Sequence, residues 1–446
     1  MGKYFGTDGV RGIANVELTA ELVYRLGRMG AYILTKSSSN PTIVVGRDTR
    51  ISGELIEHAL VAGILSIGVN VVKLGVISTP AVAYLTKKLH ADAGIMISAS
   101  HNPYLDNGIK FFGADGYKLL DAVELEIESL IDRHGDELPR PIGKEVGRVR
   151  EKYEAKDIYA EYLKTTINNS LNNLKIVLDT ANGSAYEIAP KIFKELGANV
   201  ISINSKPDGI NINDRCGSTH PEELSKIVLE NQADFGFAYD GDADRLIAID
   251  ETGHIIDGDY IMLICGQYLS EIKKLKDNTI VSTVMSNIGY YKAVEKLGLH
   301  SIETAVGDRY VIEAMRDKGL NLGGEQSGHI IFLDYNTTGD GILTSIQLAN
   351  VIKEKGLSLS ELSRGMTKYP QILENVYVAD KSKYNNNARI DKVINEIKDK
   401  LGDEGRVLVR QSGTESLIRV MAEGPDLEIL KEYIGEIASI VKVELS

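Results

Sequence analysis

The sequence is poor in the residues that build disulfide frameworks and thiol metal sites. Its 446 residues include only two cysteines, Cys216 and Cys265, which stand in unrelated contexts. Disulfide-rich secreted domains and zinc sites both need several cysteines at characteristic spacings. We therefore expect two structural thiols in a protein of the reducing cytoplasm. Tryptophan is absent as well, but its absence excludes no class of protein.

Long apolar runs and an excess of positive charge are also missing. No stretch approaches the ~20 consecutive apolar residues that span a bilayer. The first residues, MGKYFGTDGVRG, lack the apolar core of a secretory signal. The chain has 50 lysines and arginines against 63 aspartates and glutamates, a net charge of −13. Such acidity argues against nucleic acid or an anionic membrane as a partner, and a phosphorylated ligand would need cations gathered locally.

Strand-like and helix-like segments alternate through most of the chain, which is typical of parallel α/β units. The pattern restarts after a stretch rich in charge, glycine and proline at residues 135–156, and again near Gly258. The last segment instead predicts a mostly antiparallel α+β module. We expect three consecutive α/β domains with mixed, mainly parallel sheets, followed by a C-terminal α+β domain. The predicted bounds are residues 1–150, 151–256, 257–368 and 369–446.

A predicted buried strand and a polar loop occupy residues 94–112, GIMISASHNPYLDNGIKFF. Ser100 and His101 follow the apolar run, and Lys110 precedes an aromatic pair. Loops at the ends of buried strands are where α/β proteins place chemistry, so Ser100 is a candidate nucleophile or phosphoryl carrier. A lysine near a serine and a metal can act as a general acid or base. Taken alone, the stretch fits an ordinary strand-to-turn transition equally well.

Three aspartates alternate in the motif DGDADR, which begins at Asp240 just after another apolar strand. Alternate residues of extended backbone face the same side, so Asp240, Asp242 and Asp244 should converge. Converging carboxylates repel unless a cation lies among them, and oxygen ligands favour Mg²⁺ or Ca²⁺. A calcium EF-hand would use Glu251 as its last ligand, but it needs glycine where Arg245 stands. The sequence therefore predicts a Mg²⁺ site, with a solvated acidic turn as the alternative.

Two later loops carry groups suited to a sugar and to a phosphate. GGEQSGH joins two predicted strands, and its candidate partners for sugar hydroxyls are Glu325, Ser327 and His329. A plain hairpin turn with polar residues is the alternative there. RQSGTESLIR surrounds a glycine turn with hydroxyls, backbone N–H groups and two guanidiniums, which can cradle a phosphate. The candidate residues of that cradle are Arg410, Ser412, Gly413, Thr414 and Arg419.

The chain resembles the α-D-phosphohexomutases through motifs that occur along its whole length in that family's order: FGTDGVRG, SASHNP…NGIK, DGDADR, GEQSGH and RQSGTES. The resemblance implies that Ser100 is the phosphoserine, whose phosphate and the three aspartates hold Mg²⁺. Lys110 is the implied general acid or base, with His101 as the second candidate. Arg11 and Arg245 would stabilise phosphoryl charge. The GEQSGH loop would bind the sugar and RQSGTES its distal phosphate, with the four domains around a central cleft.

Within that family, the stretches GTDGVRG and AVGDRYV (residues 305–311) favour the members that act on glucosamine phosphate. The implied activity is an isomerase that interconverts glucosamine 6-phosphate and glucosamine 1-phosphate, for amino-sugar nucleotide and cell-wall precursor synthesis. A glucosamine 1,6-bisphosphate intermediate, one Mg²⁺ per site and a homodimer belong to the same implication. The alternatives are a mutase of glucose or mannose phosphate, and a non-catalytic sugar-phosphate-binding protein.

Three residues depart from the family's motifs. Ala243 stands where the metal loop usually has glycine, which costs little unless the backbone there needs a positive φ. Gln411 and Ser416 replace the two prolines of the phosphate loop. Because proline pre-sets the backbone, we expect a looser loop and somewhat weaker phosphate binding without them, but no loss of function.

Overall fold

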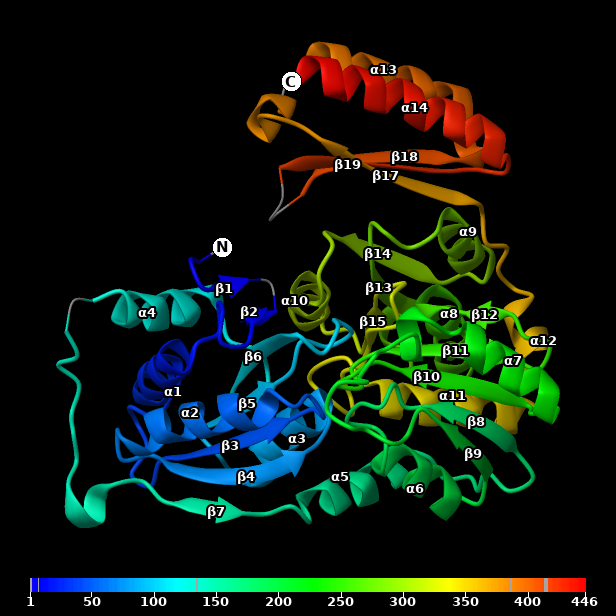
Figure 1. Cartoon of the computed structure of the whole chain (residues 1–446). Coiled ribbons are helices and arrows are strands. Elements are labelled where there is room, and N and C mark those ends of the chain that lie inside the picture. The colour runs from blue at the N-terminus through cyan, green and yellow to red at the C-terminus, as the bar shows by residue number, and fades with distance from the viewer. Residues whose placement is uncertain (1, 7, 134, 386, 413–415) are drawn as a thin grey trace. The chain divides into compact units, whose positions relative to one another are not determined.

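The computed structural model of the chain describes residues 2–6, 8–133, 135–385, 387–412 and 416–446. The chain divides into two compact units, residues 1–285 with 299–363 and residues 286–298 with 364–446. Three sheets lie in the first unit and one in the second (Figure 1). This succession confirms the predicted fold class, while the four predicted domain bounds stay a prediction. Among the described residues, every helix is too short or too polar to cross a bilayer.

The first sheet has seven strands in the order β1-β2-β6-β5-β3-β4-β7. These are β1 (Phe5–Gly6), β2 (Gly9–Ile13), β3 (Thr42–Arg47), β4 (Asn70–Val76), β5 (Ala93–Ile97), β6 (Asp106–Gly113) and β7 (Val149–Glu151). Its helices are α1 (Ala20–Leu34), α2 (Gly53–Leu65), α3 (Thr79–Lys88) and α4 (Asp121–Ile131). β5 is buried along its whole length and runs parallel to β3. The carboxyl ends of both strands, one of which leads to Ser100, therefore lie at the same edge.

The second sheet has five strands in the order β12-β11-β10-β8-β9. These are β8 (Lys175–Asp179), β9 (Asn199–Ile203), β10 (Phe235–Tyr239), β11 (Leu246–Asp250) and β12 (Ile255–Ile256), with helices α5 (Ala155–Lys164), α6 (Ile188–Glu195) and α7 (Glu222–Asn231). β10 and β11 form an antiparallel hairpin in which Tyr239 pairs with Leu246. The DGDADR motif is therefore the turn of this hairpin, and both flanking strands are fully buried.

The third sheet has four strands in the order β14-β13-β15-β16. These are β13 (Thr279–Thr283), β14 (His300–Thr304), β15 (Leu322–Gly324) and β16 (Ile330–Phe332), with helices α8 (Gly258–Glu271), α10 (Asp308–Lys318), α11 (Gly341–Lys355) and α12 (Leu359–Ser363). The GEQSGH loop is the turn between the antiparallel strands β15 and β16. The carbonyl of Gly328 in this loop accepts a hydrogen bond from the Leu246 N–H at 3.0 Å. The hairpin of β15 and β16 therefore lies against the turn of the DGDADR hairpin.

The second unit contains an antiparallel sheet in the order β17-β19-β18. Its elements are α9 (Ile288–Lys296), β17 (Gln371–Tyr377), α13 (Ala388–Leu401), β18 (Arg406–Gln411), β19 (Leu417–Glu423) and α14 (Leu427–Glu444). Apolar residues of α13 and α14, including Ile390 and Ile434, form a core with residues of the sheet such as Val420. The backbone N–H of Ile288 donates to the Glu423 carboxylate at 2.9 Å. This contact joins α9 to the unit, although α9 falls between β13 and β14 in the sequence.

Candidate active site

Ser100 lies just beyond β5 in a backbone conformation that serine rarely adopts. Its φ is +54°, and the residue is 1% exposed. Its N–H donates to the Ser98 Oγ at 3.0 Å, and its carbonyl accepts from Arg50 Nη2 at 3.1 Å and Asn213 Nδ2 at 2.9 Å. Left-handed backbone at a non-glycine residue persists only where surrounding contacts enforce it, and such strain concentrates at functional sites. These contacts fix the direction of the Ser100 side chain.

The three aspartates of the DGDADR turn converge. One carboxylate oxygen of each of Asp240, Asp242 and Asp244 lies within 4.8 Å of the others, and all three residues are buried. The convergence arises from a tight turn rather than from extended backbone, because Ala243 has φ +57°. The residue that replaces the usual glycine therefore does occupy the left-handed region, where a side chain costs roughly 1 to 2 kcal/mol.

The chemistry of this turn fits a divalent cation. Burial raises the pKa of the Asp240 carboxyl well above its ordinary value, and the neighbouring Asp244 and Asp242 add to the rise. The Oδ1 atoms of Asp242 and Asp244 are buried without a hydrogen-bond partner among the described residues. Buried carboxylate oxygens in this state are costly unless a cation engages them. Oxygen-only ligands in this number suit Mg²⁺.

The calcium-loop alternative does not fit the surroundings of the turn. Both flanking segments are strands, whereas a calcium EF-hand is flanked by helices. The Glu251 carboxylate, which would be the last ligand of such a loop, accepts hydrogen bonds from the hydroxyl and the N–H of Ser360 instead. Glu251 therefore belongs to the packing of α12.

The Ser100 hydroxyl faces the aspartate cluster. Its Oγ donates to Asp240 Oδ2 at 2.6 Å, across 140 residues of sequence. His101 Nδ1 lies 3.4 Å from the same Oγ. Burial, together with the charges of Arg245 and Arg11, lowers the pKa of His101 to about 4. His101 is therefore neutral at pH 7 and can accept a proton near Ser100.

Lys110 reaches the cluster from β6. Its Nζ lies 2.8 Å from Asp242 Oδ2, 3.4 Å from Asp244 Oδ2 and 2.9 Å from Asp8 Oδ2. Burial opposes the charged form of the lysine, but the three carboxylates outweigh it and hold the Lys110 pKa well above its ordinary value. Lys110 is therefore charged, so in this arrangement it can donate a proton or stabilise negative charge.

The two predicted arginines lie at the margin of the cluster. The Arg245 N–H donates to Asp240 Oδ1 at 3.2 Å, and its guanidinium Nε lies 3.9 Å from Asp244 Oδ1. Arg11, on β2, pairs with Asp8 through Nη2 at 2.6 Å. The Arg245 guanidinium therefore lies beside an aspartate of the cluster, and the Arg11 guanidinium lies beside Asp8, which contacts Lys110.

The sugar-loop candidates differ in their surroundings. Glu325 accepts from the Gly307 N–H at 3.2 Å, and burial raises its pKa. Ser327 is exposed. The His329 Nδ1 lies 3.6 Å from Asp244 Oδ2. Burial works against a charged His329, but Asp244 and other carboxylates outweigh it and raise the His329 pKa to about 8. The loop thus lies beside the aspartate cluster.

The remaining candidates lie in the second unit. Arg410 on β18 and Arg419 on β19 are directly opposite each other in the antiparallel register. Burial lowers the pKa of Arg410, and the charge of Arg419 lowers it further. Ser412 is buried, and its carbonyl accepts from Lys381 Nζ at 2.8 Å. The other two candidates of the predicted cradle, Gly413 and Thr414, lie outside the described residues.

Sequence reasoning missed one element of the site, the N-terminus of α3. The Thr79 N–H donates to the Asp242 carbonyl at 3.0 Å, and the Thr79 hydroxyl donates to the Asp242 carboxylate. A helix N-terminus favours negative charge, so α3 helps to hold the aspartate in place. The Thr79-Pro80 helix start was visible in the sequence, but its aspartate partner is 163 residues away.

Comparisons with known proteins agree with this arrangement. The four domains of the phosphoglucomutase/phosphomannomutase family match in order: alpha/beta/alpha domains I (residues 2–137), II (157–253) and III (257–369), and the C-terminal domain (373–440). The phosphoglucosamine mutase of Geobacillus thermodenitrificans is 58% identical over 445 residues, which cover 100% of this chain and 99% of that protein. The phosphoglucosamine mutase of Brevibacillus brevis is 56% identical, and the match covers 100% of this chain and 100% of that protein.

Solved structures share the fold. A phosphoglucomutase/phosphomannomutase family protein from Burkholderia thailandensis superposes with a TM-score of 0.82 at 25% identity, covering 100% of this chain and 98% of that one. The N-acetylphosphoglucosamine mutase of Aspergillus fumigatus, solved with GlcNAc-6P and magnesium, superposes with a TM-score of 0.70 at 18% identity, covering 99% and 96% of the two chains. Because all four domain families match and the close relatives align from end to end, the chain belongs to the phosphoglucomutase/phosphomannomutase family.

Proposed function

We propose that the chain interconverts glucosamine 6-phosphate and glucosamine 1-phosphate, with Ser100 as the phosphoryl carrier. The observation that carries the proposal is the Ser100 hydroxyl, which donates to Asp240 at 2.6 Å inside a buried cluster of three carboxylates. These surroundings do little to activate a serine for hydrolysis. A phosphorylated serine beside a cation site, by contrast, can transfer its phosphoryl group. Relatives named phosphoglucosamine mutase, 56% to 58% identical, support the glucosamine substrate.

The reaction proceeds in two phosphoryl transfers. Phosphorylated Ser100 gives its phosphoryl group to the free hydroxyl of the sugar phosphate, and the P–O bond to Ser100 breaks as the new one forms. The resulting glucosamine 1,6-bisphosphate turns over while bound, and Ser100 takes the other phosphoryl group. A Mg²⁺ ion held by Asp240, Asp242, Asp244 and the Ser100 phosphate would supply charge stabilisation at the transferring group.

The chain's own residues supply the remaining chemistry. Lys110, charged and 2.8 Å from Asp242, stabilises the transferring phosphoryl group or donates a proton. His101, neutral and 3.4 Å from the Ser100 Oγ, is the group that can accept a proton there. Glu325 and His329 face the sugar hydroxyls. Both ends of the sugar need a proton transfer partner, so acid and base alternate between the two steps.

The second unit holds the phosphate that does not react. Arg410 and Arg419 present two guanidiniums on adjacent strands, which suits bidentate contacts to a phosphate. A fixed phosphate site serves both orientations of the bisphosphate, because the sugar turns over between the steps while one phosphate always remains distal. A homodimer is part of the proposal by family resemblance.

Intact-mass measurement and turnover test the proposal together. The purified chain should carry one added phosphoryl group, lost on addition of sugar phosphate, and should turn over glucosamine 6-phosphate faster than glucose or mannose 6-phosphate. Ser100→Ala should lack the added mass and lose at least about 10³-fold in turnover. Ser129→Ala, on the exposed side of α4, is the matched control and should behave like the parent. Preference for glucose or mannose phosphate would reassign the substrate, and absent turnover with any of them would favour a non-catalytic binder.

A further inference from the structure

Six side chains of alternating charge form a closed ring beside the Ser100 site. In order around the ring they are Asp244, Lys110, Asp8, Lys118, Asp308 and His329. Lys118 Nζ pairs with the Asp8 carboxylate and lies 2.5 Å from Asp308 Oδ2. His329 closes the ring, with Nε2 at 3.6 Å from Asp308 and Nδ1 at 3.6 Å from Asp244. Nothing in the proposed chemistry assigns a role to Lys118.

Asp8 connects Lys118 to Lys110. One oxygen of its carboxylate faces Lys118 and the other lies 2.9 Å from Lys110 Nζ. Lys110 in turn divides its charge between Asp8 and Asp242, to which its distances are nearly equal at 2.9 and 2.8 Å. These groups are at most 18% exposed, so their interactions are only weakly screened. Removal of Lys118 would leave Asp8 with more uncompensated charge and a stronger pull on Lys110.

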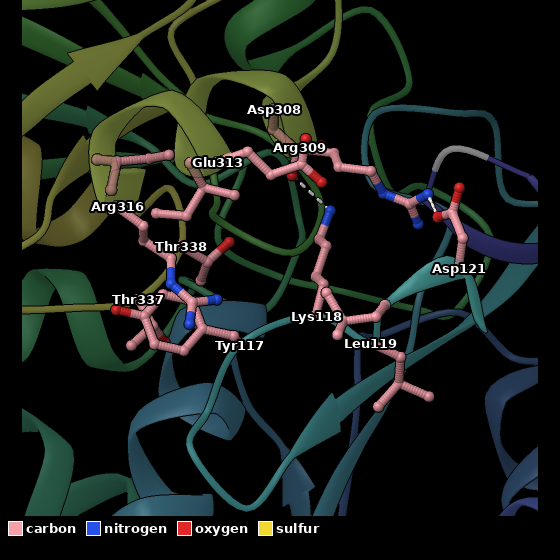
Figure 2. Close-up of a pocket in the computed structure, with 13 residues that line it drawn as sticks. Tyr117, Lys118, Leu119, Asp121, Asp308, Arg309, Glu313, Arg316, Thr337 and Thr338 are labelled. Atoms are coloured by element: carbon pink, nitrogen blue, oxygen red, sulfur yellow. Dashed lines mark hydrogen bonds and ion pairs between the residues drawn. The ribbon is translucent and has the colours of Figure 1, made fainter. Parts of the chain in front are cut away.

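The other partner of Lys118 is fixed by its own neighbours. Figure 2 shows Lys118 reaching from the segment before α4 toward Asp308, at the start of α10. The adjacent Arg309 pairs with Asp121 and lies 3.1 Å from Glu124 Oε2, both on α4. These ion pairs anchor the first turn of α10, so Asp308 offers Lys118 a stationary carboxylate.

The cavity at this place is too small for a substrate. It has a volume of about 50 Å³ and is lined by residues of both segments, including Tyr117, Lys118 and Asp308. Ligand pockets for molecules of sugar-phosphate size or larger are typically of roughly 300 Å³ or more. Lys118 also makes its ion pairs with Asp8 and Asp308 rather than with Ser100 or the aspartate turn. A role for Lys118 in the reaction must therefore act through its neighbours.

We infer that Lys118 is a positioning residue for phosphoryl transfer. It neutralises the outer side of Asp8 and so keeps Lys110 on Asp242 and Asp244, where the phosphoryl group reacts. Its ion pair with Asp308 links the position of Lys110 to the AVGDRYV stretch at the start of α10. The inference rests on the proposed function, because the position of Lys110 matters only if charge develops beside it.

Lys118→Met tests the inference, since it keeps the length of the side chain and removes the charge. We expect kcat to fall by about 10- to 100-fold, as for groups that orient a catalytic residue, while KM for the sugar phosphate changes less than about threefold. Lys118→Arg should recover part of the loss. Lys36→Met is the control, because it removes an exposed lysine that pairs with Glu126 on α4. It should leave both constants unchanged. Turnover by the parent chain in the same assay tests the proposed function separately.

A second variant separates positioning from simple stabilisation. Lys118→Met combined with Asp308→Asn removes the carboxylate that Lys118→Met leaves without its lysine, so Tm should return toward that of the parent. In the double variant Asp8 keeps Lys110 and Arg11 but still lacks the charge of Lys118 on its other oxygen, so kcat should stay low. Recovery of both Tm and kcat would show that Lys118 only neutralises Asp308, and an unchanged kcat in Lys118→Met would also overturn the inference. If Lys118→Met does not fold, the double variant and Lys118→Arg decide the question in the same way.

Discussion

The aspartate turn of the first unit and the arginine pair of the second unit collect charge of opposite sign. Asp240, Asp242 and Asp244 crowd three buried carboxylates onto one hairpin turn. Arg410 and Arg419 place two guanidiniums opposite each other on adjacent strands. Each arrangement is unfavourable by itself, because like charges repel more strongly as water is excluded.

The two regions differ in what offsets the repulsion between their like charges. The aspartate turn has cations of its own, since Lys110 and His329 lie against Asp244. Their compensation is partial, and within the part of the chain that the structure describes two carboxylate oxygens still have no hydrogen-bond partner. The arginine pair is partly buried, and this burial, together with the charge of Arg419, lowers the pKa of Arg410. Under the proposed function, a cation would complete the first region and an anionic phosphate would complete the second.

Of these two regions, the aspartate turn should give the larger effect. Asp242→Asn removes a carboxylate that accepts from both Lys110 and Thr79, so we expect turnover to fall by about 10²- to 10³-fold. The concentration of Mg²⁺ needed for half-maximal rate should rise, and the increase of Tm on adding Mg²⁺ to the parent should shrink. Asp250→Asn is the matched control, because Asp250 is a buried aspartate that accepts from Thr252 and His254 in the next turn. It should lower stability without changing the response to Mg²⁺, and an unchanged response in Asp242→Asn would contradict the metal site.

The arginine pair should give a smaller effect, mainly on KM rather than on kcat. Arg410→Ala removes one charge-assisted contact, so we expect KM for the sugar phosphate to rise by the equivalent of about 1.5 to 3 kcal/mol, with a smaller change in kcat. Without ligand the variant should be no less stable than the parent, because it relieves repulsion from Arg419. Arg389→Ala, which removes an exposed arginine paired with Glu444, is the control. An unchanged KM in Arg410→Ala would remove the phosphate role from this pair.

The smallest effect should come from the backbone of the aspartate turn. Ala243→Gly relieves the left-handed strain of a side chain but also removes a buried methyl, so the free energy of unfolding should change by less than about 1 kcal/mol. Ala238→Gly, at an equally buried position of β10, has no strain to relieve and should cost about 1 to 2 kcal/mol. Chemical denaturation measures both. Equal losses in the two variants would mean that the positive φ of Ala243 is not costly.

Local pattern was enough to predict most elements and the groups of the site. The apolar runs FGFAY and LIAID predicted the two strands around DGDADR, since a short apolar run between turn residues favours a buried strand. The geometry of the turn was predicted for the wrong reason. Extended backbone would bring alternate carboxylates together, but the structure does so with a left-handed residue at Ala243. Steric preference makes that conformation rare for alanine, so no propensity argument could favour it.

The family resemblance placed Ser100 with the three aspartates, but most other side-chain partners between distant segments could not be predicted. Lys110 has three carboxylate partners, at 102, 132 and 134 positions away in sequence, and its charged state follows from them. The helix α9 belongs to the second unit although it lies between two strands of the third sheet, because Ile288 and Asn287 bond to Glu423. The order of segments in the sequence did not indicate that α9 belongs to the second unit.

By itself the sequence determined the main chemical groups of the candidate site: a serine, three aspartates, a lysine and four arginines, mostly at predictable strand ends and turns. Side-chain chemistry and local periodicity are encoded in adjacent residues, so they can be read without the fold. Only the tertiary structure decided which of these groups form ion pairs, which are neutral, and that Lys118 pairs with Asp8. Those outcomes depend on distances of a few ångströms and on the exclusion of water, and both arise when the sheets pack together.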